Sequence, residues 1–213
     1  MSGRNQLTHI TDAATGSNSN EGVRTGQTST NYAYDGNGNL TRDNAKGITS
    51  ILYDWRNLPT RIVFSNGNFL DYFYNAEGAR IEKAFKVGGN TTRTEYEYGI
   101  NKNLVAVYDS NQTLPKYYYH EFGYLDRVTN VRYYELKDNF QSNRVVINQS
   151  GAVTERTDYF AYGAIRETAQ TAGDGRFKFL DKEQDEETGT THLKAREYDG
   201  MLQLGFNLKR INN

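Results

Sequence analysis

The stretch YAYDGNGNLT, residues 32–41, contains the pattern that decides the fold. Tyr34 and Asp35 are followed by two variable residues and Gly38, and Leu40 then opens a run typical of a β-strand. A glycine at the fourth position after the tyrosine permits the positive φ that a tight turn requires. One such unit predicts only a turn between two strands.

The chain repeats this unit at nearly constant intervals. "YDWRNLPTRI" begins 19 residues later at Tyr53, "YNAEGARI" begins 21 residues after that, and a looser copy begins 24 residues further on at Tyr98. Self-similarity near 20 residues is typical of repeat proteins, whose units each need a neighbour to bury an apolar face. We therefore interpret the motif as structural. Its positions are Tyr34, Asp35 and Gly38, then Tyr53, Asp54 and Asn57, then Tyr74, Asn75 and Gly78.

The composition favours β-sheet over helix. Only 36% of the 213 residues are hydrophobic, but 17 Tyr, 10 Phe and one Trp bury large areas per side chain and are enriched in strands. No segment shows a helical period with caps. Hairpin turns are predicted at Asn66-Gly67, Gly88-Gly89 and Ser150-Gly151. We expect a mainly β fold of antiparallel hairpins forming a twisted β-ribbon, with little helix.

Charge and hydropathy argue against several classes of function. The 25 basic and 26 acidic residues give a formal net charge of −1, so nothing predicts nucleic-acid binding. No apolar run approaches the length of a membrane span, and no Sec-type signal peptide is visible. The absence of cysteine excludes disulfides and thiolate metal sites. We predict no cofactor and no metal site. Composition alone does not assign the protein to a cellular compartment.

Together these units resemble the YD repeats of the Rhs family. The resemblance continues in "RFKFLDKEQDEETGTTHLKAREYDG", residues 176–200, which is similar to the Rhs-associated core signature. Residues 133–163 are similar to the segment that precedes this core, although their turn at 138–143 lacks the family's His and Gly. The matching core positions are Asp185, Glu187, Thr188, Gly189, Ala195, Arg196, Tyr198 and Asp199.

The resemblance implies a β-ribbon that spirals into a hollow shell around a toxic carboxy-terminal domain. Members of the family are typically secreted or exposed on the cell surface. We expect four regions in this chain: a strand-plus-loop lead-in that is partly flexible (1–31), a YD-repeat ribbon (32–132), a core-like region (133–200) and a divergent tail (201–213).

The sequence departs from the family where an aspartyl autoprotease would act. The family continues from Tyr-Asp into Pro, a Gly-Arg-Phe element and an Asp-Pro, whereas here Gly200 follows Asp199 and no Asp-Pro appears. Gly205-Phe206 resembles a remnant of the middle element. Autoproteolysis needs two carboxylates with separated pKa values in one site, so we expect no catalysis and no toxin domain.

The acidic run at residues 181–187, DKEQDEE, admits three interpretations. It could supply a general acid and base, or a calcium loop, but it lacks the spaced ligands and central glycine of such a loop. We favour a solvated turn in which Asp185 or Glu187 pairs with Arg196. The three histidines lack the spacing of zinc ligands.

Exposed aromatic residues would indicate a different function. Trp55 and the run of Tyr117, Tyr118 and Tyr119 would stack on sugar rings if they faced solvent, although packing between strands is the use we favour.

The sequence therefore predicts a non-catalytic structural segment of an Rhs/YD-repeat shell, acting as a scaffold or in encapsulation. Its partners would be other YD-repeat segments or the parent shell, and a toxin cargo. The alternative is a carbohydrate-binding or adhesive cell-surface module with a glycan partner. A third hypothesis is residual self-cleavage near Asp199.

Overall fold

The computed structural model describes residues 6–11, 26–110, 112–194, 196–202 and 204–206. These residues form two antiparallel sheets, which confirms the mainly β prediction. The strand-plus-loop lead-in expected over residues 1–31 lies mostly outside the described residues, and residues 6–11 form no strand. No helix among the described residues is long and apolar enough to cross a membrane.

Fourteen strands form the larger sheet, which we call the ribbon, and each strand pairs with the next one in the sequence. The predicted hairpins at Asn66-Gly67, Gly88-Gly89 and Ser150-Gly151 are present as β4–β5, β6–β7 and β12–β13. A single 3₁₀ turn, η1 (Asn44–Lys46), joins β2 to β3. The strands are β1 Tyr32–Tyr34, β2 Leu40–Asp43, β3 Ile48–Tyr53, β4 Pro59–Phe64, β5 Phe69–Tyr74, β6 Arg80–Val87, β7 Asn90–Tyr98, β8 Leu104–Asp109, β9 Tyr117–His120, β10 Gly123–Asp126, β11 Val131–Lys137, β12 Asn143–Asn148, β13 Val153–Tyr159 and β14 Ile165–Gln170.

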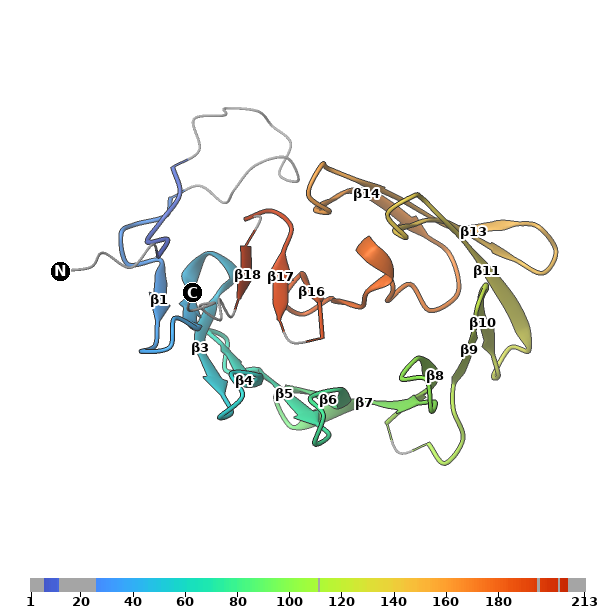
Figure 1. Cartoon of the computed structure of the whole chain (residues 1–213), viewed down its shortest axis with the longest axis horizontal. Coiled ribbons are helices and arrows are strands. Elements are labelled where there is room, and N and C mark those ends of the chain that lie inside the picture. The colour runs from blue at the N-terminus through green and yellow to red at the C-terminus, as the bar shows by residue number, and fades with distance from the viewer. Residues whose placement is uncertain (1–5, 12–25, 111, 195, 203, 207–213) are drawn as a thin grey trace.

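The remaining chain, residues 171–206, is called the strap. It contains η2 (Phe179–Asp181) and a four-stranded sheet of β15 (Gln184–Asp185), β16 (Thr190–His192), β17 (Glu197–Asp199) and β18 (Leu204–Phe206). The ribbon curves into an open C, and the strap lies on its concave side (Figure 1). The ribbon runs without a break to β14, so the domain boundary expected between 132 and 133 falls inside β11.

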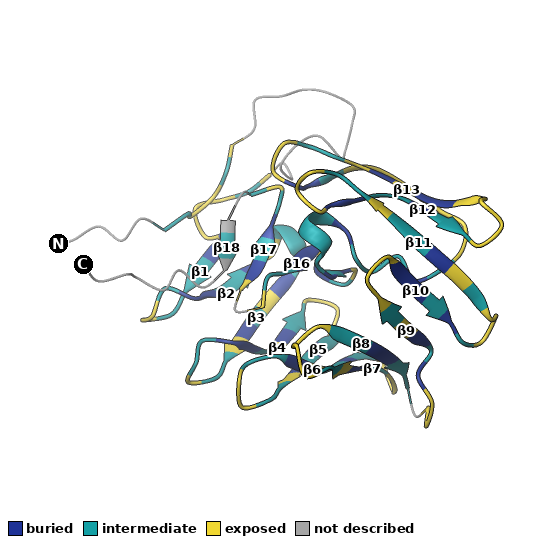
Figure 2. Ribbon diagram, turned by 45° about the vertical axis from the view of Figure 1, so that its right-hand side comes forward, coloured by how far each residue is buried: buried dark blue, intermediate teal, exposed yellow. Residues whose placement is uncertain are grey.

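Two clusters of buried residues line the ribbon. Exposed residues concentrate in the hairpin turns at its rims (Figure 2). The first cluster comprises Tyr32, Leu40, Ile48, Ile51, Ile62, Leu70 and Tyr72. The second comprises Tyr117, Tyr124, Tyr133 and Val146.

One five-residue turn recurs eight times along the ribbon. The first residue donates its amide proton to the carbonyl of the fifth, and the amide of the fourth donates to the carbonyl of the first. The fourth residue of each of these turns has a positive φ, between 62° and 89°. These turns are 35–39, 54–58, 64–68, 75–79, 99–103, 138–142, 148–152 and 160–164. The geometry is a type I turn with a following left-handed residue, which suits hairpin strands.

An Asp or Asn at the first position closes five of these turns with its side chain. Asp35 Oδ1 accepts the amides of Asn37 and Asn39, at 2.9 and 2.8 Å. The same pair of bonds forms at Asp54, Asn75, Asp138 and Asn148. Asx side chains favour turns because they replace backbone partners in this way.

Four tyrosines, each directly before one of these turns, bind the chain beside an earlier turn. Each hydroxyl donates to the carbonyl of the residue five positions after the Asp or Asn that opens the earlier turn. These bonds are Tyr53 to Leu40, Tyr74 to Pro59, Tyr98 to Arg80 and Tyr159 to Asn143, at 2.7, 2.9, 2.9 and 2.8 Å. The repeat tyrosines therefore join successive hairpins through hydrogen bonds.

Candidate functional site

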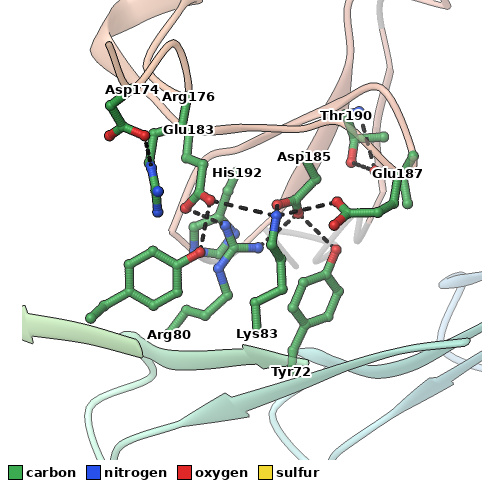
Figure 3. Close-up of polar contacts among 12 residues, drawn as sticks. Tyr72, Arg80, Lys83, Asp174, Arg176, Glu183, Asp185, Glu187, Thr190 and His192 are labelled. Carbon is green, nitrogen blue, oxygen red and sulfur yellow. Dashed lines mark hydrogen bonds and ion pairs between the residues drawn. The ribbon is translucent and has the colours of Figure 1, made fainter. Parts of the chain in front are cut away.

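An extensive polar cluster lies where the strap contacts the ribbon. We call this contact, made by ribbon residues such as Arg80 and strap residues such as Asp185, the seam. Arg80, the first residue of β6, reaches two strap carboxylates: Nη2 is 2.7 Å from Glu183 Oε2, and Nη1 is 2.8 Å from Asp185 Oδ2. Arg80 is 1% exposed and Asp185 is 0% exposed. Figure 3 shows these side chains meeting from the two sheets. A buried charge is costly to desolvate unless it is paired, so this contact depends on all three groups.

Lys83 adds a second cation from the same strand. Its Nζ is 3.1 Å from Asp185 Oδ1, 3.2 Å from Glu187 Oε2 and 3.7 Å from Glu183 Oε1. The three acidic residues are spaced by two, which in an extended chain directs their side chains to one side. Two ribbon cations thus face three strap carboxylates.

Two ribbon tyrosines complete the hydrogen bonding of these carboxylates. The Tyr72 hydroxyl donates to Asp185 Oδ2 and the Tyr96 hydroxyl donates to Glu183 Oε1, both at 2.7 Å. The Arg80 guanidinium carbon also lies 4.9 Å and 5.5 Å from the centroids of their rings, which places the cation between two π faces.

The charges in this cluster fix its protonation states. Burial alone would raise the pKa of Asp185, but Arg80 and Lys83 outweigh it and hold the pKa well below its usual range. Burial, reinforced by the adjacent carboxylate, raises the pKa values of Tyr72 and Tyr96 well above 10. The carboxylates therefore remain charged acceptors and the phenols remain donors.

His192 and Glu197 extend the cluster within the strap. His192 Nδ1 lies 2.7 Å from Glu197 Oε1, and Glu197 Oε2 accepts a hydrogen bond from the Thr190 hydroxyl at 3.1 Å. Glu197 Oε1 is also 3.9 Å from Arg80 Nη1. These contacts link β16 and β17 to the same ribbon cation.

A second contact joins the strap to the start of the ribbon. Lys46 of η1 places Nζ 2.6 Å from Asp199 Oδ2 and 2.9 Å from the Thr188 carbonyl. Asp199 Oδ1 accepts the amides of Met201 and Leu202 at 2.9 and 3.2 Å. Burial, and to a smaller degree Asp199, raises the pKa of Asp43 nearby. Asp199 Oδ2 thus joins the strap to η1, while Oδ1 orders the turn that follows β17.

A third contact joins the strap to the far half of the ribbon. Asp174 accepts hydrogen bonds from the Tyr119 hydroxyl and from Arg176 Nε, and its amide donates to the Tyr124 hydroxyl at 2.7 Å. Burial raises the pKa of Asp174. Lys178 pairs with Glu155 of β13, and both are buried. The strap is therefore tied to the ribbon at three places along its length.

Asp185, Glu187, Thr188 and Asp199 of the core signature lie at this seam, but not as the sequence suggested, and Ala195 lies outside the described residues. The acidic run is not a solvated turn, since Glu183 and Asp185 are buried. The expected pairing with Arg196 is wrong: that side chain is exposed, and Arg80 and Lys83 take its place. Gly189 turns the chain at φ 65°, its amide donating to the Asp185 carbonyl, and Tyr198 donates to the Tyr162 carbonyl.

The aromatic candidates for sugar stacking do not come together. Tyr117 is 5% exposed and belongs to the second buried cluster, and Tyr119 packs against that cluster and binds Asp174. Trp55 is 88% exposed at a turn, whereas Tyr118 is 41% exposed on β9. The tyrosine run is therefore structural at two of its three positions.

The sequence did not predict the ribbon residues of the seam. Arg80, Lys83, Tyr72 and Tyr96 carry no motif of their own, and their partners lie 87 to 113 positions away. The usable signal was the spacing of Glu183, Asp185 and Glu187 by two, which indicates one side of an extended chain facing a common partner.

The seam is built to hold two parts of one chain together. Its carboxylates are paired with cations or accept hydrogen bonds. Among the residues that the structure describes, no three His, Asp or Glu side chains are grouped to hold a metal ion.

A curved ribbon of YD hairpins that holds a polar strap on its concave side is the architecture of a shell-wall segment. The chain belongs to the Teneurin YD-shell family, which matches residues 20–204. This match, and the solved structures below, confirm the Rhs/YD-repeat resemblance.

The chain is also similar to two named relatives and to parts of solved structures. The chain is 26% identical over 200 residues to the tRNA3(Ser)-specific nuclease WapA of Bacillus spizizenii and to the tRNA nuclease WapA of Bacillus subtilis. Each alignment covers 92% of this chain and only 8% of the relative. The fold is similar to part of the Tc holotoxin pore of Photorhabdus luminescens, with a TM-score of 0.67, 15% identity, and coverage of 84% of this chain and 9% of that one. It is also similar to TcdB2-TccC3-Cdc42, with a TM-score of 0.63, 13% identity, and coverage of 82% and 9%.

Proposed function

We propose that this chain is a non-catalytic wall segment of a YD-repeat shell, whose strap fixes the curvature of the ribbon. The observation that carries the proposal is the buried contact of Arg80 with Glu183 and Asp185. It uses charged groups for an intramolecular seam instead of leaving them free for substrate. The cargo expected for such a shell is a polypeptide held on the concave side, and encapsulation or scaffolding would be its role.

Catalysis can be tested directly, because the relatives bear the names of tRNA nucleases. The purified chain is incubated with total tRNA over a range of pH, and both the RNA and the intact protein mass are followed. We expect full-length tRNA and an unchanged mass. Specific tRNA cleavage, or a protein fragment ending near Asp199, would refute the non-catalytic assignment.

The structural role predicts that the strap is protected from protease. Trypsin should leave the strap uncut at Arg176, Lys178 and Lys182 for much longer than it leaves Lys102, which is exposed in the turn at 99–103. An Arg80→Met variant should become susceptible at Arg176, Lys178 and Lys182. Equal rates of strap cleavage in the wild type and in Arg80→Met would show that the Arg80 contact does not hold the strap. The proposed function would then lose the observation that supports it.

The alternative, a carbohydrate-binding module, rests on the exposed Trp55 alone. A glycan array together with Trp55→Gln tests it. Retention on a glycan that this substitution abolishes would favour the adhesive function.

A further inference from the structure

The contact that joins the strap to η1 brings a lysine and an aspartate together at close range. Lys46 is the last residue of η1 and Asp199 is the last residue of β17, and Nζ lies 2.6 Å from Oδ2. The Asp199 side chain is 2% exposed and the Lys46 side chain is 18% exposed. Oδ2 makes no hydrogen bond with the described residues, so this is a close ion pair without hydrogen-bond geometry.

The amine of Lys46 is within reach of the carboxyl carbon of Asp199. A carboxyl carbon–oxygen bond is about 1.2 Å long, so Cγ is less than about 4 Å from Nζ. Reacting atoms held about 3–3.5 Å apart are near the geometry of attack, and such positioning removes much of the barrier to reaction. Nζ also donates a hydrogen bond to the Thr188 carbonyl at 2.9 Å, which holds the amine beside Asp199.

A second buried carboxyl lies near this pair. Asp43, directly before η1, is 1% exposed, and its Oδ1 accepts the backbone amide of Lys46 at 3.3 Å. Its Oδ2 is buried and makes no hydrogen bond with the described part of the chain. Burial raises the pKa of Asp43 against the opposing charge of Lys46, and the charge of Asp199 adds to the increase. A buried carboxyl of this kind is suited to accept a proton and return it.

The first buried cluster borders the site and makes its charges costly. Tyr32 belongs to that cluster, and burial, followed by the charges of Asp43 and Asp199, raises its pKa to about 12. Leu202, which follows Asp199 in the strap, packs against the same cluster. Burial disfavours the ionised forms of a Lys–Asp pair, and transfer of one proton from Nζ to Oδ2 makes both groups neutral. The neutral amine is a nucleophile, and the protonated carboxyl is an electrophile.

We propose that Lys46 and Asp199 form an intramolecular isopeptide bond after the strap docks, with Asp43 as the proton-transfer group. The bond from Nζ to Cγ forms and the bond from Cγ to Oδ2 breaks, so the products are an amide and one water molecule. The ammonium supplies both hydrogens of this water: one passes directly to Oδ2 and the other passes through Asp43. The pair and the amide both have zero net charge, and no other reactant is needed.

The seam contains a lysine and an aspartate that do not meet these conditions. Lys83 Nζ lies 3.1 Å from Asp185 Oδ1, but Arg80 and Lys83 together hold the pKa of Asp185 well below its usual range. A carboxylate that keeps its charge is a poor electrophile, so this pair stays ionic. The covalent bond goes beyond the proposed function, because the ion pairs of the seam hold the strap without it.

The mass of the purified full chain tests the bond. The wild type should be lighter than its sequence by one water molecule, and a digest made under denaturing conditions should contain a branched peptide that joins residues 46 and 199. Lys46→Arg keeps the cation and should have the full mass. Asp43→Asn should form the bond about a hundredfold more slowly, as loss of a general acid–base group does. Lys178→Arg, in the buried pair with Glu155, is the matched control and should lose water as the wild type does.

Three results would overturn the proposal. A wild type that keeps its full mass after prolonged incubation would exclude the bond. Water loss without the branched peptide, or water loss that persists in Lys46→Arg, would assign the loss to a succinimide at Asp199-Gly200. Equal rates in Asp43→Asn and the wild type would remove the role of Asp43.

Two further measurements separate these outcomes from other failures. Melting temperatures show that each variant folds, so a missing bond is not the result of misfolding. Protease protection of the strap requires its docking and not the covalent bond. Failure of the isopeptide bond is therefore distinguishable from failure of the proposed function.

Discussion

Arg80 and Asp185 lie 105 positions apart in the sequence and form a buried ion pair, with Nη1 2.8 Å from Oδ2. Arg80 has two roles in the fold. Its carbonyl accepts the hydroxyl of Tyr98, which is the joint between successive YD units, and its side chain fastens the strap. The repeat and the seam therefore meet at one residue.

Replacing Arg80 by methionine should be strongly destabilising. The substitution keeps an apolar stem but leaves Glu183 and Asp185 buried without their closest cation, with Lys83 and Arg176 as the cations that remain nearby. Breaking a buried ion pair from one side costs about 3–5 kcal/mol of unfolding free energy. Denaturant titration measures this loss. Arg61→Met, which removes an exposed pair with Asp71, is the control and should cost no more than about 1 kcal/mol. Similar losses in the two variants would contradict the seam's importance.

The tyrosine joints should each contribute measurably to stability. Tyr53→Phe and Tyr74→Phe remove only the hydroxyls that donate to the carbonyls of Leu40 and Pro59. Each loss should lower the free energy of unfolding by about 0.5–1.5 kcal/mol. Tyr118→Phe, at a β9 residue that is 41% exposed, should have almost no effect in the same titrations. Indistinguishable stabilities for all three variants would show that the repeat tyrosine acts through its ring alone.

The hairpins and their turns could be predicted from the sequence, whereas the seam could not. Turn chemistry is local: Asp35 and Gly38 lie within one turn and specify it by themselves. Arg80 meets Asp185 only because the ribbon curves, and that curvature is a property of fourteen strands together. The acidic run was interpreted as a solvated turn that pairs with Arg196, because no local rule identifies a partner on a strand about 100 positions away.

Two glycines of one turn should respond oppositely to alanine. Gly38 has φ 89° and Gly36 has no positive φ, while a Cβ at either position would meet no atom within 4 Å. Gly38→Ala should therefore cost about 1–2 kcal/mol from backbone strain alone. Gly36→Ala should be neutral or stabilise by up to about 1 kcal/mol, because it restricts the unfolded chain. Thermal melts of the two variants provide the comparison, and a loss at Gly36 as large as that at Gly38 would refute the turn assignment.

The seam should lose stability in acid. Asp185 and Glu183 have lowered pKa values in the folded state, because the cations Arg80 and Lys83 outweigh the effect of burial. Below about pH 4 the unfolded chain therefore binds protons that the folded chain does not, and the free energy of unfolding falls as the pH decreases. Asp43 and Asp174 have raised pKa values and act in the opposite sense at higher pH, where stability falls as the pH rises.

Denaturant titrations at pH 5 and pH 3 isolate the effect of the seam. The wild type should be less stable at pH 3, and Arg80→Met should lose less between the two values because its carboxylates lack the cation that lowers their pKa. Parallel losses in the two proteins would assign the acid response to groups outside the seam.

The glycine that replaces the family's proline after Asp199 should be required for docking of the strap. A Cβ at Gly200 would lie 2.6 Å from the Ala164 nitrogen, which is backbone and cannot move aside as a flexible side chain would. Gly200→Ala should therefore push β17 away from the turn at 160–164 and weaken the Lys46 contact with Asp199. We expect faster hydrogen exchange in β16 and β17 and a lower melting temperature. Gly205→Ala is the matched control within the same sheet, since the contact that its Cβ would make with the described residues is to the Arg196 side chain, at an ordinary 3.6 Å. Unchanged exchange in Gly200→Ala would mean that the strap is held by its ion pairs alone and tolerates a shift at this turn.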